Sequence, residues 1–265
     1  MSTSTAFAAA RAEGRAALVG YLPAGFPDLQ GSVEAMRVMV DGGCDVIEIG
    51  LPYSDPVMDG PTIQAAAQQA LEAGTRTTDV LRTVEAVAAT GVPTVVMTYW
   101  NPICRYGVER FAKDLADAGG AGMITPDLVP DEAGSWVDVA DELGLDKIFL
   151  VAPSSTDERL RMTTEACRGF VYATAVMGVT GARESSSDLA GPLVARARAA
   201  TTLPVGVGLG VSNGDQAAEV AEFADGVIVG SAFVRRLLDA GTDRAAGLAS
   251  LAELTRDLAY GVRRA

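Results

Sequence analysis

The sequence predicts an α/β protein folded as a single (β/α)8 TIM barrel with an extra helix or two. Three observations lead to this prediction. The chain has 265 residues, 49% of them hydrophobic, which is enough to build one large core. Short apolar segments rich in β-branched residues recur along it, and several follow a helical pattern that ends in glycine. An open doubly wound sheet is the main alternative, since eight parallel strands can also form one.

Each recurring apolar segment is predicted to be one strand of the barrel. The expected strands are residues 17–21, 46–51, 94–99, 122–126, 147–152, 169–175, 204–208 and 226–230. Before the second strand, Val33, Met36 and Val40 share one helical face and precede a glycine pair. The gap between the second and third strands is the longest and leaves room for an extra helix near residues 78–89. Because no linker or composition shift interrupts the pattern, we expect residues 1–265 to form one barrel domain.

Composition narrows the classes of function. A formal net charge of −13 argues against nucleic-acid binding, although backbone amides in one loop can still hold a phosphorylated small molecule. Three scattered cysteines argue for a reducing compartment and against a disulfide framework or a zinc site. The chain contains no histidine, which removes imidazole bases, Ser-His-Asp triads and histidine-rich metal sites. Acid–base chemistry must therefore come from carboxylates, Lys, Tyr or Cys.

The N-terminal residues MSTSTAFAAARAEG have only a short apolar patch, soon interrupted by Arg11 and Glu13. This is not the pattern of a secretory signal, and no apolar run approaches the length of a membrane span. We therefore expect a cytoplasmic protein that does not enter a membrane.

The segment VIEIGLPYSDPVMDGP, residues 46–61, is the most informative part of the chain. It places one carboxylate, Glu48, inside a run of β-branched residues, where burial of an ionised group costs free energy unless it has a partner or a task. Two further acids, Asp55 and Asp59, follow on a loop broken by prolines and glycine. Acids in such different environments can take different pKa values and face one substrate. The alternative is that Glu48 pairs with a core Lys or Arg while the loop acids only cap a helix.

Glycine-rich turns follow the last three predicted strands and form a second group of candidate site residues. Glycines permit close backbone approach to an anion, and Ser231 stands where a new helix with the apolar face Phe233, Val234 and Leu237 begins. Barrels commonly bind phosphate after strands seven and eight. The glycines concerned are Gly178, Gly181, Gly208, Gly210 and Gly230.

These segments resemble the tryptophan synthase α subunit family. The string EIGLPYSDPVMDGPTIQ, residues 48–64, resembles the signature of that family. So do MTYWNPICRYG, GVTGA, GLGVSN and GSAFV further along, and the similarity runs from about residue 20 to residue 238. The resemblance implies a lyase that cleaves indole-3-glycerol phosphate to indole and glyceraldehyde 3-phosphate by a retro-aldol reaction.

The resemblance also implies catalytic roles for two acids. Glu48 matches the family's general acid/base, which protonates indole C3 and then removes the side-chain hydroxyl proton. Asp59 matches the loop carboxylate that accepts a hydrogen bond from the indole N–H and stabilises positive charge on the ring.

Supporting roles follow from the same resemblance. Tyr172 matches a tyrosine beside the acid/base, and Thr180 a loop threonine that bonds the aspartate when the site closes. Tyr21, where the family often has Phe, and Tyr99 would form walls of the indole pocket. Without the resemblance, these would be core aromatics and a turn residue. The phosphate binders implied are Gly181, Gly210, Gly230 and Ser231. The loops expected to close over substrate are residues 53–60 and the segment after Gly178.

The family works as an α2β2 complex in which indole passes to a β subunit that carries pyridoxal phosphate. The resemblance implies that Asp55, Asn101 and Pro102 lie at the partner interface, with Ile103 exposed beside them. No cofactor is expected on this chain, because Lys113 lies in a helical pattern and Lys147 precedes a strand, so neither sits in a βα loop.

Three other functions remain open at the level of sequence. One is a stand-alone lyase that releases free indole. Another is a barrel kept only as an allosteric binding partner, which would have no need of both Glu48 and Asp59. The third is a different phosphate-binding barrel such as indole-glycerol-phosphate synthase, which would need a catalytic lysine at a strand end.

Overall fold

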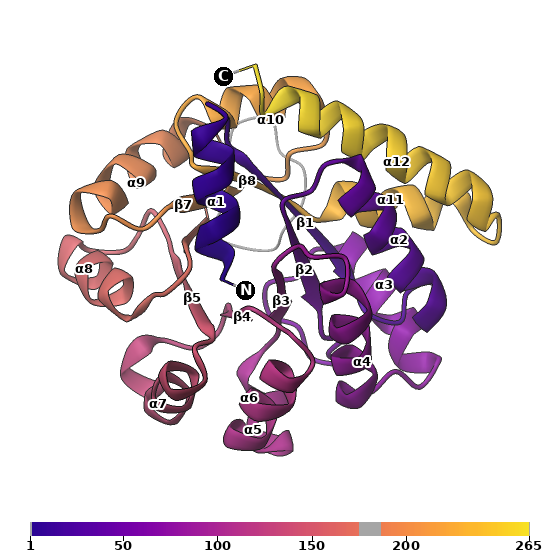
Figure 1. Ribbon diagram of the computed structural model, residues 1–265, viewed down its shortest axis with the longest axis horizontal. Helices are drawn as coiled ribbons and strands as arrows, with labels where there is room; N and C mark the ends of the chain where they lie inside the picture. The colour runs from indigo at the N-terminus through magenta and orange to yellow at the C-terminus, as the bar shows by residue number, and fades with distance from the viewer. Residues whose placement is uncertain (1, 175–186, 265) are drawn as a thin grey trace.

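The described strands form a closed parallel barrel. The computed structural model describes residues 2–174 and 187–264, and its strands follow chain order around the ring, with β1 paired to β8 through Ala17 and Gly226 (Figure 1). The strands are β1 Ala17–Pro23, β2 Val46–Gly50, β3 Thr94–Met97, β4 Gly122–Thr125, β5 Asp146–Val151, β6 Val171–Thr174, β7 Val205–Gly208 and β8 Gly226–Val229. This confirms the predicted barrel and excludes the open sheet.

Helices cover the outside of the ring (Figure 1). The extra helix predicted near residues 78–89 is α4, Thr77–Ala88. The other helices are α1 Thr3–Ala12, α2 Leu29–Gly42, α3 Pro61–Glu72, α5 Trp100–Tyr106, α6 Val108–Asp117, the 3-10 helix η1 Pro130–Glu132, α7 Gly134–Leu143, α8 Asp157–Ala166, α9 Ser187–Ala200, α10 Gly214–Ala221, α11 Ser231–Ala240 and α12 Arg244–Gly261. Among the described residues, no helix combines the length and the apolar character that crossing a membrane requires.

The core has two layers, because successive side chains of a strand point to opposite faces. One layer fills the barrel interior and includes Val19, Val46, Ile148 and Ile228. The other lies between the strands and the surrounding helices. Glu48 follows Val46 by two residues on β2 and therefore also faces the interior, nearer the C-terminal ends of the strands.

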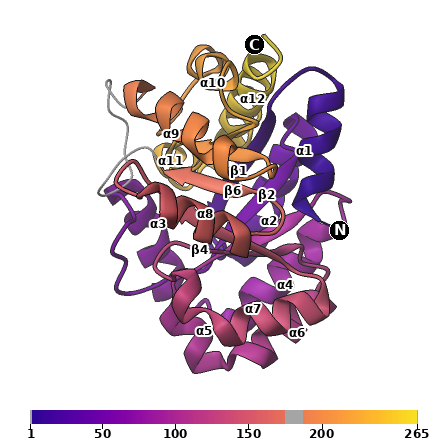
Figure 2. The same cartoon turned by 90° about the vertical axis from the view of Figure 1, so that its left-hand side faces the viewer.

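Helix α1 lies across the opposite end of the barrel, at the N-terminal ends of the strands (Figures 1 and 2). Its Phe7 belongs to the interior layer and stacks on Phe170, with ring centroids 5.0 Å apart. The wholly buried carboxylate of Asp146, the first residue of β5, accepts hydrogen bonds from the backbone N–H and the hydroxyl of Thr3, both at 2.7 Å. Asp146 thus anchors the start of α1, which closes the floor of the barrel.

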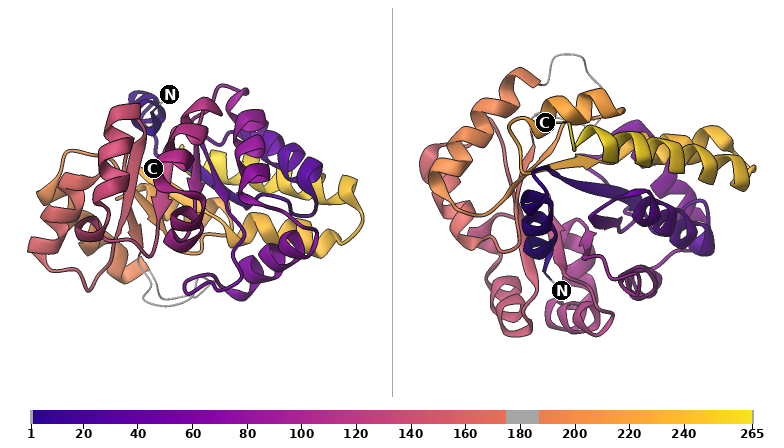
Figure 3. Two further views of the ribbon diagram at one scale, coloured as in Figure 1. Left: turned by 90° about the horizontal axis from the view of Figure 1, so that it is seen from below. Right: turned by 45° about the horizontal axis from the view of Figure 1, so that its top comes forward.

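The last helix, α12, is the longest of the described helices and runs along the outside of the barrel (Figure 3). It packs on α2, α10 and α11. These helices follow β1, β7 and β8, so α12 braces the side of the barrel where the chain closes the ring.

Candidate active site

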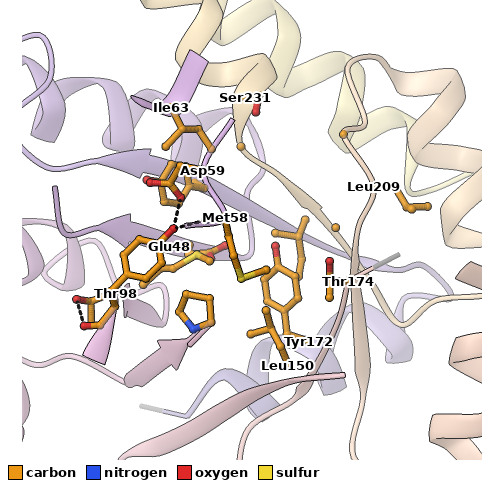
Figure 4. Close-up of a pocket in the computed structure, with 18 of the residues that line it drawn as sticks. Glu48, Met58, Asp59, Ile63, Thr98, Leu150, Tyr172, Thr174, Leu209 and Ser231 are labelled. Carbon is orange, nitrogen blue, oxygen red and sulfur yellow. Dashed lines mark hydrogen bonds between the residues drawn. The ribbon is translucent and has the colours of Figure 1, made fainter. Parts of the chain in front are cut away.

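A cavity opens at the C-terminal ends of the strands. It gathers most of the residues that the sequence singled out, from positions far apart in the chain (Figure 4). The predicted residues that line it are Tyr21, Glu48, Asp59, Tyr99, Tyr172, Gly210, Gly230 and Ser231. The two groups of candidate residues found in the sequence, the acids and the glycine-rich turns, therefore line the same cavity.

Glu48 is the deepest charged group of this cavity. It is 1% exposed, and neither carboxylate oxygen has a hydrogen-bond partner among the described residues. Burial raises the pKa of Glu48 from 4.5 to about 8. The alternative of a core ion pair is therefore wrong, since no described Lys or Arg side chain pairs with Glu48. At neutral pH this carboxyl group holds a proton that it can donate.

Asp59 lies on the loop that leads into α3, at the mouth of the cavity. Burial raises its pKa, and a hydrogen bond from Tyr99 opposes that rise. The Tyr99 hydroxyl donates to Asp59 Oδ1 at 3.1 Å and accepts from the Met58 N–H at 3.0 Å (dashed lines in Figure 4). Because Asp59 has a donor and Glu48 has none, the two acids occupy different electrostatic environments.

Two tyrosines of the cavity are held over glycines of neighbouring strands. A Cβ atom at Gly50 would lie 2.2 Å from the Tyr21 hydroxyl, and one at Gly230 would lie 3.3 Å from Tyr21 Cδ1. The Tyr21 ring therefore occupies a slot between the ends of β2 and β8. Across the barrel, a Cβ atom at Gly208 would lie 2.7 Å from the Tyr172 hydroxyl. Burial raises the pKa values of both tyrosines, and so does the neighbouring charge of Glu48.

Two of the predicted phosphate-binding residues lie at the start of α11. Ser231 is the first residue of this helix and Gly230 its N-cap, so the N–H groups of the first turn and the Ser231 hydroxyl are available at the cavity. Phe233, Val234 and Leu237 form its buried face, as predicted. Gly210 has a φ of +73°, a conformation that favours glycine. Among the described residues, no Lys or Arg lines the cavity.

Apolar walls of the cavity were missed by the sequence reasoning. They include Leu51, Met97, Leu150 and Ile228 at the ends of strands, and Met58 and Ile63 in or next to residues 53–60, which we call the acidic loop. Thr98 and Thr174 add hydroxyl groups to the lining. The strand residues among these could have been predicted, because each faces inward near the C-terminal end of a strand. No signal indicated that Met58 turns inward from the acidic loop.

Three predicted site residues, Gly178, Thr180 and Gly181, lie outside the described residues, as does much of the second expected lid. The predicted interface residues gather elsewhere. Asp55, Asn101 and Pro102 line a separate surface hollow, which we call the outer hollow. Ile103 was expected to be exposed beside them, and this is wrong: it is fully buried, because α5 turns that side chain into the core.

Metal and lysine chemistry receive no support from the described part of the chain. It contains no group of three or more Cys, Asp or Glu residues that could hold a metal ion. Lys147 was expected to precede a strand, but it lies within β5, which begins one residue earlier at Asp146. Its amine donates to Asp141. It therefore points away from the cavity.

The fold and the site define a (β/α)8-barrel enzyme with two carboxyl groups, those of Glu48 and Asp59, in the cavity at the C-terminal ends of its strands. A family model described as "Tryptophan synthase alpha chain" matches residues 7–263. The tryptophan synthase alpha chain of Acidothermus cellulolyticus is 63% identical over 254 residues, covering 96% of this chain and 94% of that one. That of Salinispora tropica is 64% identical over 258 residues, with 97% and 96% covered.

Solved structures agree. A chain of Mycobacterium tuberculosis tryptophan synthase superposes with a TM-score of 0.92 at 56% identity, and the match covers 98% of both chains. Tryptophan synthase subunit alpha of Legionella pneumophila gives 0.89 at 31% identity, covering 99% of this chain and 98% of that one. The chain belongs to the tryptophan synthase alpha chain family.

The family assignment sets the activity. The chain is an enzyme subunit, a lyase that cleaves indole-3-glycerol phosphate, and it partners a β subunit. In this family pyridoxal phosphate belongs to the β subunit. The assignment favours the α subunit over the three other functions considered from the sequence.

The sequence predicts that Ser231 binds the phosphate of the substrate, and this prediction implies a defined kinetic change. Replacing Ser231 by Ala removes one hydrogen bond to a charged group, worth about 1.5–3 kcal/mol, so KM should rise roughly 10- to 100-fold. The value of kcat should change little, because the phosphate is bound equally in ground and transition states. Steady-state cleavage kinetics measure both constants. The matched control is Ser212→Ala, whose hydroxyl bonds Gln216 outside the cavity. A kcat loss without a KM change would contradict this role.

Proposed function

We propose that Glu48 is the general acid and base of the cleavage and that Asp59 binds and polarises the indole ring. The observation that supports this most strongly is that two acids of one cavity lie in different electrostatic environments. Glu48 is buried without a partner and has a pKa raised to about 8, while Asp59 sits at the mouth with a donated hydrogen bond. Glu48 is thus supplied in its neutral form, while the hydrogen bond from Tyr99 favours the charged form of Asp59.

The neutral form of Glu48 fits the first step of the reaction. It donates its proton to C3 of the indole ring, which becomes tetrahedral while the ring takes up positive charge. The resulting Glu48 carboxylate then accepts the proton of the hydroxyl group on the side chain. As that proton leaves, the carbonyl group of glyceraldehyde 3-phosphate forms, the bond to C3 breaks and its electron pair restores neutral indole. Glu48 ends the cycle protonated, as it began.

Asp59 acts at the other end of the ring. Its carboxylate accepts a hydrogen bond from the indole N–H and opposes the positive charge that develops there. The surrounding wall is proposed to consist of Tyr21, Tyr99 and Tyr172, and the phosphate is proposed to rest on Gly210, Gly230 and Ser231. Roles for Thr180 and Gly181 stay predictions from the sequence.

Three further proposals accompany the mechanism. Asp55, Asn101 and Pro102 are proposed as contacts to the β subunit, since they share the outer hollow next to the acidic loop. We propose that the whole chain is one barrel domain, because both described parts belong to the same ring. The protein is proposed to work in the cytoplasm, where the chemistry of its three unpaired cysteines fits a reducing environment.

The role of Asp59 is tested by Asp59→Asn. The amide keeps the shape of the side chain and removes the charge that opposes the developing indoleninium. We expect kcat for cleavage of indole-3-glycerol phosphate to fall roughly 10²- to 10³-fold, the usual effect of removing one group that stabilises transition-state charge. Indole release measures the rate, in the complex with the β subunit and in its absence. Asp131→Asn is the control, because Asp131 pairs with Arg159 on the surface. Retention of near-normal kcat by Asp59→Asn would refute the assignment.

A further inference from the structure

Arg235 joins the helix that begins at the predicted phosphate site to the helix that follows Asp59. Helices α3 and α11 pack side by side on the outside of the barrel (Figure 1). Arg235 of α11 donates from Nη2 to the hydroxyl of Thr62, the second residue of α3, at 2.5 Å. Ser231, one turn before Arg235, and Ile63, next to Thr62, both line the catalytic cavity (Figure 4). The contact between the two helices therefore lies beside two lining positions of the cavity.

The starts of these two helices lack the groups that usually neutralise a helix N-terminus. Gly60 and Gly230 are their N-cap residues, and neither supplies a side-chain hydrogen bond to the first turn. Neither helix has an acidic residue in its first turn, although the partial positive charge of the N–H groups favours one there. By contrast, α2 and α10 are capped by the side chains of Asp28 and Asn213. The two uncapped helix starts thus leave positive potential beside the cavity.

The positive charge of Arg235 is not neutralised by a described side chain. Its described acceptor is the neutral Thr62 hydroxyl, and no Asp or Glu in the described part of the chain pairs with it. Arg235 follows Ser231 by four residues, so the two share one face of α11. A helical side chain also leans toward the N-terminus of its helix. The guanidinium group, held at the start of α3, therefore lies on the side of α11 that leads to Ser231.

A phosphorylated substrate needs a charge of this kind. Its phosphate group is close to doubly negative at neutral pH, and it enters a chain whose formal net charge is −13. Glu48 and Asp59 line the same cavity, where the described lining residues include no Lys or Arg. The phosphate contacts proposed at Gly230 and Ser231 are neutral groups. A cation next to them offsets the repulsion without touching the reacting atoms.

We propose that Arg235 is a positioning residue for the substrate phosphate and that Thr62 holds it in place. The charge of Arg235 attracts the phosphate group to the first turn of α11, and Thr62 keeps the guanidinium group where the two helices meet. This inference rests on the proposed phosphate-binding roles of Gly230 and Ser231. Because Arg235 does not act on the reacting atoms, its effect is confined to binding of the phosphorylated substrate.

The first test is Arg235→Met, measured in both directions of the reaction with the full chain assembled with the β subunit. In cleavage, KM for indole-3-glycerol phosphate should rise roughly three- to tenfold, the effect of losing one attraction between partly exposed charges. The value of kcat should stay nearly the same, because the phosphate is bound equally in ground and transition states. In the reverse condensation, KM should rise for glyceraldehyde 3-phosphate and stay unchanged for indole, which carries no phosphate. A loss of packing alone would affect both substrates. An unchanged KM for glyceraldehyde 3-phosphate would overturn the proposal.

Two further variants separate the charge from the shape of the side chain. Arg235→Lys keeps the positive charge, so it should restore most of the affinity that Arg235→Met loses. Arg236→Met is the matched control, because it removes the same charge from the next exposed position of α11, which is rotated by roughly 100° around the helix. Its KM should equal that of the native protein. An equal rise of KM in Arg236→Met would show that net charge, and not the position of Arg235, sets the affinity.

Salt provides a readout that a purely structural role would not change. Raising the ionic strength should raise KM of the native protein more than KM of Arg235→Met, since screening weakens only a charge that is present. Equal salt dependence of the two proteins would contradict an electrostatic role for Arg235.

Thr62→Val tests how Arg235 is held. Valine keeps the shape of threonine and removes the acceptor of the guanidinium group, so KM should rise about two- to fourfold, the effect of one hydrogen bond. In the Arg235→Met background the same substitution should have no further effect, because no guanidinium group is left to hold. Strictly multiplicative increases of KM would overturn the role of Thr62.

Ser231→Ala separates this inference from the proposed phosphate site. If Ser231→Ala leaves KM unchanged, the proposed phosphate site fails. If Ser231→Ala raises KM while Arg235→Met behaves as the native protein, only the present inference fails.

Discussion

Glu48→Gln should lose most of its cleavage activity and gain stability. Positioned proton transfer is typically worth a factor of about 10²–10⁴, so kcat should fall by at least roughly 100-fold. The substituted amide cannot donate a proton to C3 or accept one from the hydroxyl group. The fold should remain intact, since Gln has nearly the volume of Glu and no described partner is lost. Indole release under saturating substrate measures the loss, and near-normal turnover would remove Glu48 from the mechanism.

The stability change should depend on pH with a definite sign. Between the ordinary pKa of 4.5 and the folded value of about 8, the unfolded chain releases the Glu48 proton while the folded protein keeps it. The unfolded state then binds fewer protons, so the free energy of unfolding falls as pH rises through this range. The Glu48→Gln variant has no titrating group at this position, so its free energy of unfolding does not fall for this reason. Its advantage should therefore grow between pH 5.5 and 8 by on the order of 3 kcal/mol, since each pKa unit is worth about 1.4 kcal/mol.

Urea unfolding of the native protein and of Glu48→Gln at these two pH values provides the measurement. The difference between the two proteins is the quantity of interest, because the other titrating groups are common to both. An advantage that stays constant, or that shrinks toward pH 8, would show that Glu48 titrates near its ordinary pKa in the folded state.

Asp146→Ala should be among the most destabilising substitutions in the chain. It removes a wholly buried carboxylate that accepts bonds from Thr3 N–H, Thr3 Oγ1 and the Ser2 hydroxyl. Thr3 is also wholly buried, so its donors would be left without a partner at the start of α1. Hydrogen bonds to charged groups contribute about 1.5–3 kcal/mol each in such settings, but the contributions of donors that share one acceptor do not add, and we expect a total loss of about 3–4 kcal/mol.

Thermal and urea unfolding measure this loss. Asp131→Ala is the control, since Asp131 and its ion-pair partner Arg159 are both exposed to solvent. The substitution of Asp146 should also increase hydrogen exchange in α1 more than in the outer helices. Equal stability of the two variants would mean that α1 closes the barrel without help from Asp146.

The strands could be predicted from the sequence, whereas the floor of the barrel could not. A buried parallel strand is an unbroken apolar run, and such a run is visible without knowledge of its neighbours. The expected ranges 46–51 and 226–230 fall within one residue of β2 and β8. Helix α1 gave no such signal, because its buried residues Phe7 and Ala10 are few and its anchor, Asp146, lies far along the chain. A contact of that kind depends on closure of the ring.

The residues of the site also fall into those that the sequence could predict and those that it could not. Glu48 and Asp59 could be found because acids in an apolar strand and a proline-rich loop are unusual locally. The hydrogen bond of Tyr99 and the slot that holds Tyr21 could not, since they depend on which strands become neighbours and on how far a loop folds back. Residues chosen for their chemistry were thus predictable, and residues chosen for their place beside another element were not.

The glycine slot limits how the enzyme can be adapted to other substrates. Gly50 and Gly230 already carry the smallest side chains, so neither can be reduced further to admit a bulkier ring. Extra room on this side of the cavity has to come from Tyr21 itself, whose ring fills the slot. A library aimed at substituted indoles should therefore vary Tyr21 first and keep both glycines, because any larger residue at Gly50 forces Tyr21 toward the substrate.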